Sequence, residues 1–178
     1  QTGFVTSETG LQSIINISLK MQPESPVYLP LIHSSDSTEG TVSPLYITFT
    51  QANWNIPQTV TITGIDDAAF DGAQEYTVSM DPSMSGDYYY NAIPFESFKV
   101  INTDNDTAGI TVNPVAGLLT TEAGGSATFN VRLNSQPSAN VIFPSISSSD
   151  TTEGTVSPSS LTFTPLNWNT PQTVTVTG

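Results

Sequence analysis

Cysteine is absent from this 178-residue chain, and basic side chains are nearly absent. Without cysteine, neither disulfide bonds nor thiol chemistry can stabilise or operate the protein. Sixteen acidic residues face only three basic ones, Lys20, Lys99 and Arg132, which gives a formal charge of −13. Nucleic acids and anionic membranes are bound through basic surfaces, so this charge excludes both as partners and favours cations.

Long apolar runs are lacking as well. No stretch of 18 apolar residues occurs, so we expect no direct insertion into a membrane. Serine, threonine and asparagine are abundant while lysine and arginine are scarce, which favours an extracellular location on a bacterial cell surface over the cytosol. The sequence shows no signal peptide and no initial methionine, as expected of a processed or excised fragment.

What the chain does have is an internal repeat. Residues 8–64 recur as residues 122–178 without a gap, at a constant offset of 114 (122 − 8). A period of this length is too long for a solenoid unit and matches one small domain. The sequence therefore predicts two like domains, at residues 1–106 and 107–178.

Neither repeat is expected to be complete. Residues 108–114 form a strand-like segment that opens repeat 2 and has no counterpart ahead of Gln1, while repeat 1 continues past the equivalent of Gly178. Repeat 1 should therefore lack its opening strand, and repeat 2 its closing strands. Either a longer parent chain contains these strands, which we favour, or neighbouring copies supply them by strand addition.

Short alternating segments separated by turn residues predict an all-β fold. No segment has convincing helical periodicity. Seven strands in about 110 residues suit an immunoglobulin-like β-sandwich, so the fold class is tandem immunoglobulin-like β-sandwiches of about seven strands each, the second truncated. We place the strands of repeat 1 at residues 4–7, 13–19, 27–33, 41–50, 59–65, 75–80 and 97–103.

The order of these strands gathers carboxylates at one end of repeat 1. Consecutive strands in such a sandwich mostly run antiparallel, so the connections after strands one, three and five, and the exit of strand seven, lie at the same end. The loops at the other end are far less acidic. The oxygen-bearing side chains expected at the acidic end are Glu8, Glu39, Asp66, Asp67, Asp71, Asp104, Asn105 and Asp106.

Such a cluster calls for a cation. Two carboxylates about 4 Å apart repel by roughly 4 kcal/mol at an effective dielectric of about 20. Hard oxygen ligands at irregular spacing suit Ca²⁺, which takes 6–8 oxygens in flexible geometry, better than Mg²⁺. Zinc is disfavoured by the single histidine and the lack of cysteine. The alternative, a set of separately solvated acidic loops, is what most charge clusters are; the convergence of several loops favours Ca²⁺ over it.

These residues resemble the Calx-beta-like repeats of large bacterial surface proteins, which are related in fold to the calcium-binding domains of sodium–calcium exchangers. Glu8 and Glu122, each followed two positions later by glycine, resemble the family's first-strand glutamate and its tight turn. Glu39 and Glu153, each followed by Gly-Thr, resemble its acidic-Gly-Thr signature.

The remaining acidic residues extend the resemblance. Asp66 and Asp67 with Asp71 resemble the family's acidic loop before the penultimate strand, and residues 104–106 resemble its acidic exit. Asp71 and Glu75 both stay candidates for the third ligand of that loop. Repeat 2 ends ahead of any equivalent of this loop, so we expect one or two Ca²⁺ in repeat 1 and none with full coordination in repeat 2.

The expected function is that of a non-enzymatic structural module, in which Ca²⁺ stiffens the junction between repeats and the array supports cell adhesion or surface architecture. Its partners would be neighbouring repeats or copies of the same protein. Two alternatives stay open. One is a secreted filament subunit completed by strand exchange, and the other is a module that binds a glycan or a host surface protein through the loop at Tyr88, Tyr89 and Tyr90.

Catalysis is not expected. The segment from His33 to Asp36 contains the residue types of a hydrolytic triad. However, adjacent residues of a strand point to opposite faces and so cannot form one relay. Repeat 2 also has Ser147 at the position of His33.

Overall fold

The computed structural model describes residues 3–178. The chain divides into two compact units, which we describe separately: unit one contains residues 1–67 and 71–105, and unit two contains residues 68–70 and 106–178. The domain bounds expected from the sequence, 1–106 and 107–178, stay a prediction. In the described part of the chain no helix is long and apolar enough to cross a membrane.

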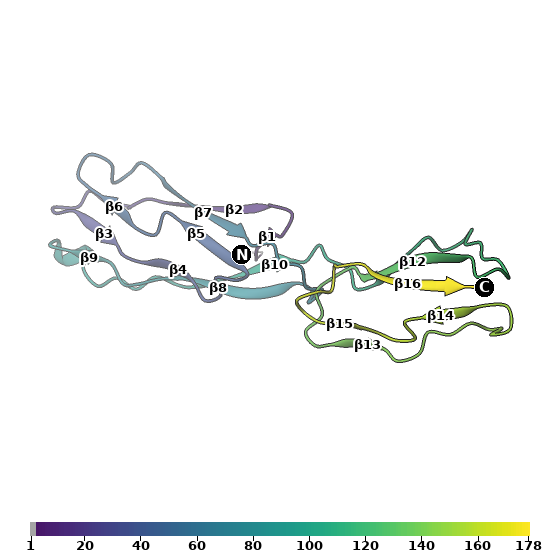
Figure 1. Cartoon of the computed structure of the whole chain (residues 1–178). Coiled ribbons are helices and arrows are strands. Elements are labelled where there is room, and N and C mark those ends of the chain that lie inside the picture. Colours follow the sequence, from purple (N-terminus) through teal and green to yellow (C-terminus); the bar gives the residue numbers. More distant parts are fainter. Residues whose placement is uncertain (1–2) are drawn as a thin grey trace. The chain divides into compact units, whose positions relative to one another are not determined.

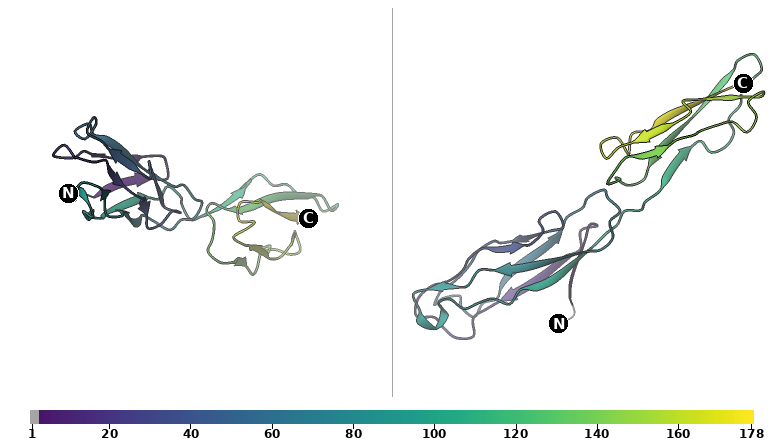
Figure 2. Two further views of the ribbon diagram at one scale, coloured as in Figure 1. Left: turned by 90° about the vertical axis from the view of Figure 1, so that its left-hand side faces the viewer. Right: turned by 90° about the horizontal axis from the view of Figure 1, so that it is seen from below.

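Unit one is a sandwich of short strands (Figures 1 and 2). Its sheets have the orders β1-β10-β8-β4, β2-β7-β5 and β6-β3-β9. Among the described residues of this unit, the single helical element is the 3-10 turn η1 (Tyr88–Tyr90). The strands are β1 (Phe4–Ser7), β2 (Gln12–Ile17), β3 (Val27–Leu29), β4 (Ile32–Ser34), β5 (Gly40–Ser43), β6 (Ile47–Phe49), β7 (Gln58–Gly64), β8 (Gln74–Met80), β9 (Met84–Ser85) and β10 (Phe98–Thr103).

Two of the expected strands are in fact each divided between two sheets. The prediction of one strand over residues 27–33 is wrong, because the chain breaks at Leu31, whose φ of 41° is left-handed. As a result β3 pairs with β6 and β9, while β4 pairs with β8. The strand expected at residues 41–50 breaks in the same way at Pro44, which has no N–H to donate.

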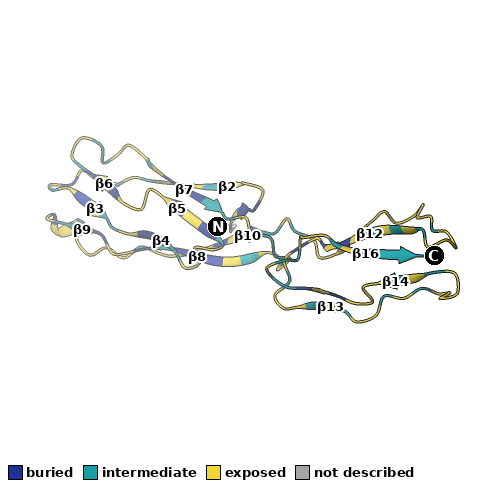
Figure 3. Ribbon diagram, viewed as in Figure 1, coloured by how far each residue is buried: buried dark blue, intermediate teal, exposed yellow. Residues whose placement is uncertain are grey.

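The core of unit one lies between its sheets. Val60 and Ile62 on β7 face Tyr76 and Val78 on β8, and all four side chains are buried. They recur at every second position because side chains alternate across a strand. Buried positions alternate with exposed ones along β5 and with partly buried ones along β8 (Figure 3). The all-β sandwich predicted from the sequence is confirmed.

Unit two repeats part of this plan with fewer strands. Its sheets have the orders β11-β12-β16-β14 and β13-β15. Residues 106–178 contain no counterpart of β8 or β10, so its buried apolar core is limited to Val131, Leu133, Leu161, Phe163 and Val174. The strands are β11 (Ile110–Asn113), β12 (Ser126–Leu133), β13 (Val141–Phe143), β14 (Thr155–Ser157), β15 (Leu161–Phe163) and β16 (Gln172–Thr177).

Candidate metal centre

Strand pairing brings four acidic segments of unit one to one end of the sandwich. β1 and β10 run parallel, with Ser7 beside Thr103, so the residues that follow both strands leave the sheet together. On the other sheet Gly40 pairs with Gly64, and the Ile65 N–H donates to the Glu39 carbonyl at 2.9 Å. The loop before β5 and the loop after β7 are thereby held side by side.

The first carboxylate group consists of Glu8, Asp104 and Asp106. Each offers one carboxylate oxygen, and these oxygens lie within 4.8 Å of one another. Glu8 follows β1 and is only 8% exposed, while Asp104 and Asp106 follow β10 and are partly buried. The Asn105 N–H donates to Glu8 Oε2 at 3.0 Å, which fixes the exit of β10 against the end of β1.

The second carboxylate group consists of Glu39, Asp67 and Asp71, whose oxygens also lie within 4.8 Å of one another. Glu39 is partly buried, and the two aspartates are exposed. The Asp71 N–H donates to Asp104 Oδ2 at 3.1 Å, and the Gly72 N–H donates to the same oxygen at 2.7 Å. The loop after β7 is therefore tied to a member of the first group.

The two other predicted ligands, Asp66 and Asn105, are joined to each other by a hydrogen bond. Asn105 Nδ2 donates to Asp66 Oδ1 at 3.0 Å, so the Asn105 amide contacts one side chain while its backbone holds Glu8. All eight residues predicted from the sequence thus belong to the two groups or to hydrogen bonds that reach them. Glu75, the competing candidate, is on β8 instead and pairs with Lys99.

A buried polar network supports the site and was not foreseen from the sequence. Asn102 on β10 is 1% exposed, and its Nδ2 donates to Glu39 Oε2 at 3.3 Å and to the Ile65 carbonyl at 3.0 Å. Its Oδ1 accepts from the hydroxyl of Thr6 at 3.1 Å, which also lies 3.3 Å from the Tyr76 hydroxyl. An isolated asparagine in an apolar strand was the only sequence signal for this network.

Two glycines permit the close approach of these segments. A Cβ at Gly40 would overlap the ring of Tyr76, and a Cβ at Gly64 would overlap Asn102 Oδ1 and lie 2.7 Å from the Ser7 carbonyl oxygen. Any larger residue at either position would push β5 or β7 away from the other sheet. Both glycines therefore help to place Glu39 near the loop after β7.

The electrostatics of Glu39 reflect the crowding of negative charge. Burial raises the pKa of Glu39 above its usual 4.5, and the charges of Asp71, Asp36 and Asp67 raise it further, against the opposing hydrogen bond from Asn102. A cation held among these oxygens would reverse this preference, because it would favour the charged carboxylate. Each group offers up to six carboxylate oxygens from three side chains, which suits the 6–8 oxygen ligands of Ca²⁺.

The equivalent acidic residues of unit two lie in different surroundings. Glu122 and Glu153 occupy the positions of Glu8 and Glu39 shifted by 114, and both are exposed. Among residues 3–178 the only groups of three such ligands that lie together are the two described above, and neither contains Glu122 or Glu153.

The tyrosine loop has one ring packed on the core and two rings that are exposed. Tyr90 covers the edge of the core, with its hydroxyl donating to the Met21 carbonyl at 2.7 Å. Tyr88 and Tyr89 are 88% and 78% exposed, with ring centroids 5.7 Å apart in an edge-on arrangement.

No protein-family model matches this sequence, and no curated protein matches it. Among solved structures, CBD12 from CALX1.2 is 13% identical, with 98% of this chain and 71% of that chain covered at a TM-score of 0.39. The calcium binding domain CBD12 of CALX1.1 is 12% identical, with 98% and 72% covered at a TM-score of 0.39. SSP-19, an MSP-domain protein like family member in Caenorhabditis elegans, is 15% identical, with 57% and 92% covered at a TM-score of 0.38. The β-sandwich assignment itself rests on the sheets and cores described above.

Proposed function

We propose that this chain is a non-enzymatic, calcium-binding structural module of an extracellular bacterial surface protein. Ca²⁺ would bind at the acidic end of unit one, stiffen the junction between repeats and so support adhesion or cell-surface architecture. The observation that carries the proposal is the pair of carboxylate groups, each with three ligand oxygens within 4.8 Å of one another. Loops far apart in the sequence supply both groups.

The choice of Ca²⁺ follows from the ligand chemistry. The groups offer carboxylate oxygens, supplemented by the Asn105 side chain close to Asp66. Loops that contribute ligands at irregular spacing fit the flexible coordination of Ca²⁺, whereas Mg²⁺ demands octahedral order and keeps its waters. The chain has no cysteine and one histidine, which disfavours zinc.

The proposed role is mechanical. Extracellular modules bind Ca²⁺ with dissociation constants of about 10⁻⁴–10⁻³ M. At millimolar Ca²⁺ each site then stabilises the folded state by roughly 0.4–1.4 kcal/mol, from RT ln(1 + [L]/Kd). This is small beside the stability of a sandwich domain, but it is enough to shift the populations of a hinge.

Calcium titration calorimetry on the full chain tests the proposal, with the internal repeat supplying the controls. Loss of a residue that only supports a metal ligand typically weakens metal binding by ~10–100-fold. Because Glu8 and Asp67 would be ligands themselves, we expect Glu8→Gln and Asp67→Ala to weaken Ca²⁺ binding by at least this much. Glu122→Gln, the matched change in unit two, should leave the affinity unchanged. Equal affinities in Asp67→Ala, Glu8→Gln and the parent chain would remove the site.

The mechanical part needs a separate measurement. Small-angle scattering of the full chain with Ca²⁺ and with a chelator should give a narrower distribution of molecular dimensions when Ca²⁺ is bound. Identical distributions in the presence of demonstrated binding would leave a calcium site without a stiffening role.

A second candidate function is supported by the exposure of Tyr88 and Tyr89, whose rings form an uncovered aromatic pair. Such a pair on a loop suits contact with a sugar ring or with a host surface protein. A glycan array probed with the full chain and with Tyr88→Ala/Tyr89→Ala would separate this role from the structural one. Loss of a defined glycan signal in the variant would support it, and absence of any signal in the parent chain would contradict glycan binding.

A further inference from the structure

The segment between β7 and β8 contains the only Asp-Gly dipeptide of the sequence, Asp71–Gly72, and the sequence has no Asn-Gly. In an Asp-Gly pair the backbone nitrogen of the glycine can attack the side-chain carboxyl carbon of the aspartate. Glycine has no side chain that obstructs this approach. The peptide between Asp71 and Gly72 is therefore the position of this chain with the greatest intrinsic tendency to rearrange.

The rearrangement balances with water as its only other reactant. The Gly72 nitrogen gives up its proton and bonds to Asp71 Cγ, and a carboxyl oxygen leaves as water, which closes a succinimide ring. Water then adds to either ring carbonyl. Cleavage of the bond from nitrogen to Cγ restores aspartate, whereas cleavage of the bond from nitrogen to the main-chain carbonyl carbon gives isoaspartate, whose backbone runs through Cβ and Cγ.

The surroundings of Asp71 and Gly72 leave room for this reaction. Both residues lie outside the strands, and Asp71 is exposed. Gly72 has a φ of 77°, and a Cβ built on it would meet no atom within 4 Å beyond its chain neighbours. The Asp71 N–H donates to Asp104 Oδ2 at 3.1 Å, and the Asp71 carbonyl accepts from Gln74 Nε2 at 2.9 Å. Both of these bonds hold the backbone of Asp71 and not its carboxyl group.

One contact opposes the reaction in the folded chain. The Gly72 N–H donates to Asp104 Oδ2 at 2.7 Å, so the nitrogen that must attack is held towards the end of β10. Its proton, which must leave, is the one shared with the Asp104 carboxylate. Attack on Asp71 Cγ requires this hydrogen bond to break and the nitrogen to turn towards the Asp71 side chain, because bond formation needs the reacting atoms aligned.

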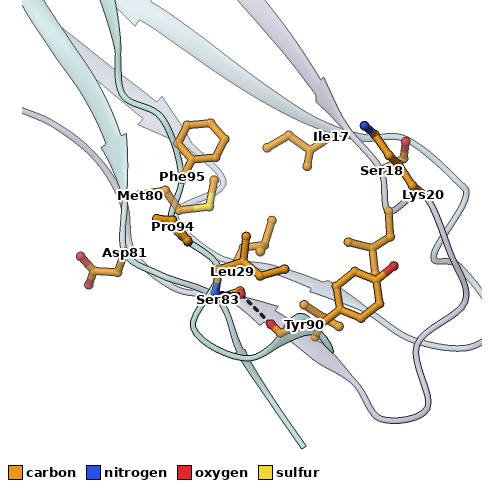
Figure 4. A pocket seen from close by; sticks show the side chains of 13 residues that line it. Ile17, Ser18, Lys20, Leu29, Met80, Asp81, Ser83, Tyr90, Pro94 and Phe95 are labelled. Atoms are coloured by element: carbon orange, nitrogen blue, oxygen red, sulfur yellow. Dashed lines mark hydrogen bonds between the residues drawn. The ribbon is translucent and has the colours of Figure 1, made fainter. Parts of the chain in front are cut away.

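The aspartate at the other end of β8 cannot react in this way. Asp81 lies at the rim of an apolar cavity of about 430 Å³, with its carboxylate turned away from the cavity (Figure 4). It is followed by Pro82, whose nitrogen has no hydrogen to give up. Asp81 is thus an exposed aspartate of the same unit that should stay unmodified under conditions in which Asp71 reacts.

We propose that Asp71–Gly72 is a site of spontaneous conversion to isoaspartate, and that the Asp104 carboxylate restrains this conversion while unit one is folded. Isoaspartate lengthens the backbone of the loop and shortens the arm of the carboxylate. A converted chain therefore no longer places this carboxylate beside those of Glu39 and Asp67, where it lies in the unmodified chain. Conversion would then remove one ligand of the second carboxylate group, and this consequence alone rests on the proposed function.

Ageing of the full chain in a chelator tests the proposal. Isoaspartate is quantified by enzymatic methylation of its free carboxylate and located by peptide mass spectrometry. In urea, where no fold restrains the loop, it should accumulate at Asp71 ahead of every other aspartate and not at Asp81. In the folded parent chain the rate at Asp71 should be lower by about tenfold or more, because a hydrogen bond to a charged group must first break.

Two variants of Asp104 identify the restraint. Asp104→Ala removes the acceptor of the Gly72 N–H and should raise the rate at Asp71 in the folded chain by about tenfold. Asp104→Asn keeps a neutral acceptor, so its rate should lie between those of the parent and Asp104→Ala, and it serves as the test if Asp104→Ala does not fold. Circular dichroism and the urea midpoint of each variant establish that unit one is folded.

Asp66→Ala is the matched control. It removes a carboxylate of the same loop and its hydrogen bond from Asn105, but neither of the bonds that Asp104 accepts from Asp71 and Gly72. Its rate at Asp71 should equal that of the parent chain. Hydrogen exchange gives a second readout, because the Gly72 amide should exchange faster in Asp104→Ala and at the parent rate in Asp66→Ala.

Equal rates at Asp71 in the folded parent chain and in both Asp104 variants would overturn the proposal. So would the same acceleration in Asp66→Ala, which would reveal a general loosening of the loop, or a lack of isoaspartate at Asp71 in urea. All rates are measured in chelator and do not depend on whether Ca²⁺ binds, so failure here and failure of the calcium proposal are distinguishable.

Discussion

The two units contain nearly the same loops but place them in different surroundings. Glu8 is 8% exposed and sits in a carboxylate group, whereas Glu122, its equivalent, is exposed and outside any such group. The difference comes from the strands that follow. β8, β10 and the loops around them provide the partners of Glu8 and Glu39 in unit one, and unit two has no counterpart of them within residues 106–178.

Local structure, in contrast, is the same in both units. Thr38 N–H and Oγ1 donate to Asp36 Oδ1 at 2.9 and 2.6 Å, and Thr152 donates to Asp150 Oδ1 at the same two distances. These contacts span two residues and need no distant strand. The comparison teaches that the turns are determined locally, while the core and the candidate metal site depend on long-range pairing.

The largest expected effect concerns the size of the two cores. Phe49 and Phe163 are equivalent and both fully buried, so replacement of either by alanine should cost about 3–5 kcal/mol. Unit two has only five buried apolar residues to absorb this loss, against eleven in unit one. Phe163→Ala should therefore unfold unit two, while Phe49→Ala should leave unit one folded but less stable.

Urea unfolding followed by tryptophan fluorescence can separate the units, because Trp54 reports on unit one and Trp168 on unit two. Each Phe→Ala change is made in a Trp54→Phe or a Trp168→Phe background so that one unit is observed at a time. A folded Trp168 signal in Phe163→Ala at zero urea would show that unit two is more stable than its core implies.

The next largest effect is the loss of stability expected when alanine replaces Gly40, in contrast to its equivalent Gly154. A Cβ at Gly40 would overlap the buried ring of Tyr76, whereas the nearest atom to a Cβ at Gly154 is the Thr177 carbonyl oxygen at 3.4 Å. Gly40→Ala should destabilise unit one by about 1–3 kcal/mol, as overpacking does, and Gly154→Ala should be close to neutral in unit two. Unfolding midpoints from the same fluorescence assay measure both changes. Equal shifts would mean that Tyr76 can move aside.

Much of unit one was predictable from its sequence, for reasons that the residues make plain. Period-2 patterns in β7 and β8 and the alternation of strand direction were enough to predict that Glu8, Glu39 and the residues after β7 and β10 meet at one end. The breaks at Leu31 and Pro44 were missed, since apolar residues on both sides of each break continue the strand pattern. The role of Asn102 was missed because its partners Thr6 and Glu39 are distant in the sequence.

A smaller effect concerns the charge of Glu39 in the calcium-free protein. Burial raises its pKa above 4.5, as do the charges of its neighbours, so its protonation favours the folded state. This contribution is present below the unfolded-state pKa and is lost as pH rises through the folded-state pKa. In chelator, Glu39→Gln should raise the urea midpoint of unit one at pH 7, and the advantage should shrink as the pH falls towards 4.5.

Glu153→Gln is the matched control and should leave the midpoint of unit two unchanged, because Glu153 is exposed and outside any carboxylate group. Added Ca²⁺ should reverse the effect at position 39, since the parent carboxylate would then be a ligand. A lower midpoint for Glu39→Gln in chelator would show that the bond from Asn102 outweighs burial and repulsion.

The smallest expected effect is the one that should be equal in the two units. The pKa values of Asp36 and Asp150 are lowered below 3.8, and the largest cause in each case is the side-chain hydrogen bond from Thr38 or Thr152. The smaller causes are also equivalent in the two units. A lowered pKa stabilises the folded state above the unfolded-state value, and this stabilisation is lost as pH falls through the folded-state pKa. Asp36→Asn and Asp150→Asn should thus each produce a small fall in the urea midpoint of their own unit at pH 7, and this fall should shrink as the pH drops below 3.8. Unequal falls would show that distant strands influence even these local turns, and would weaken the division between local and long-range structure drawn above.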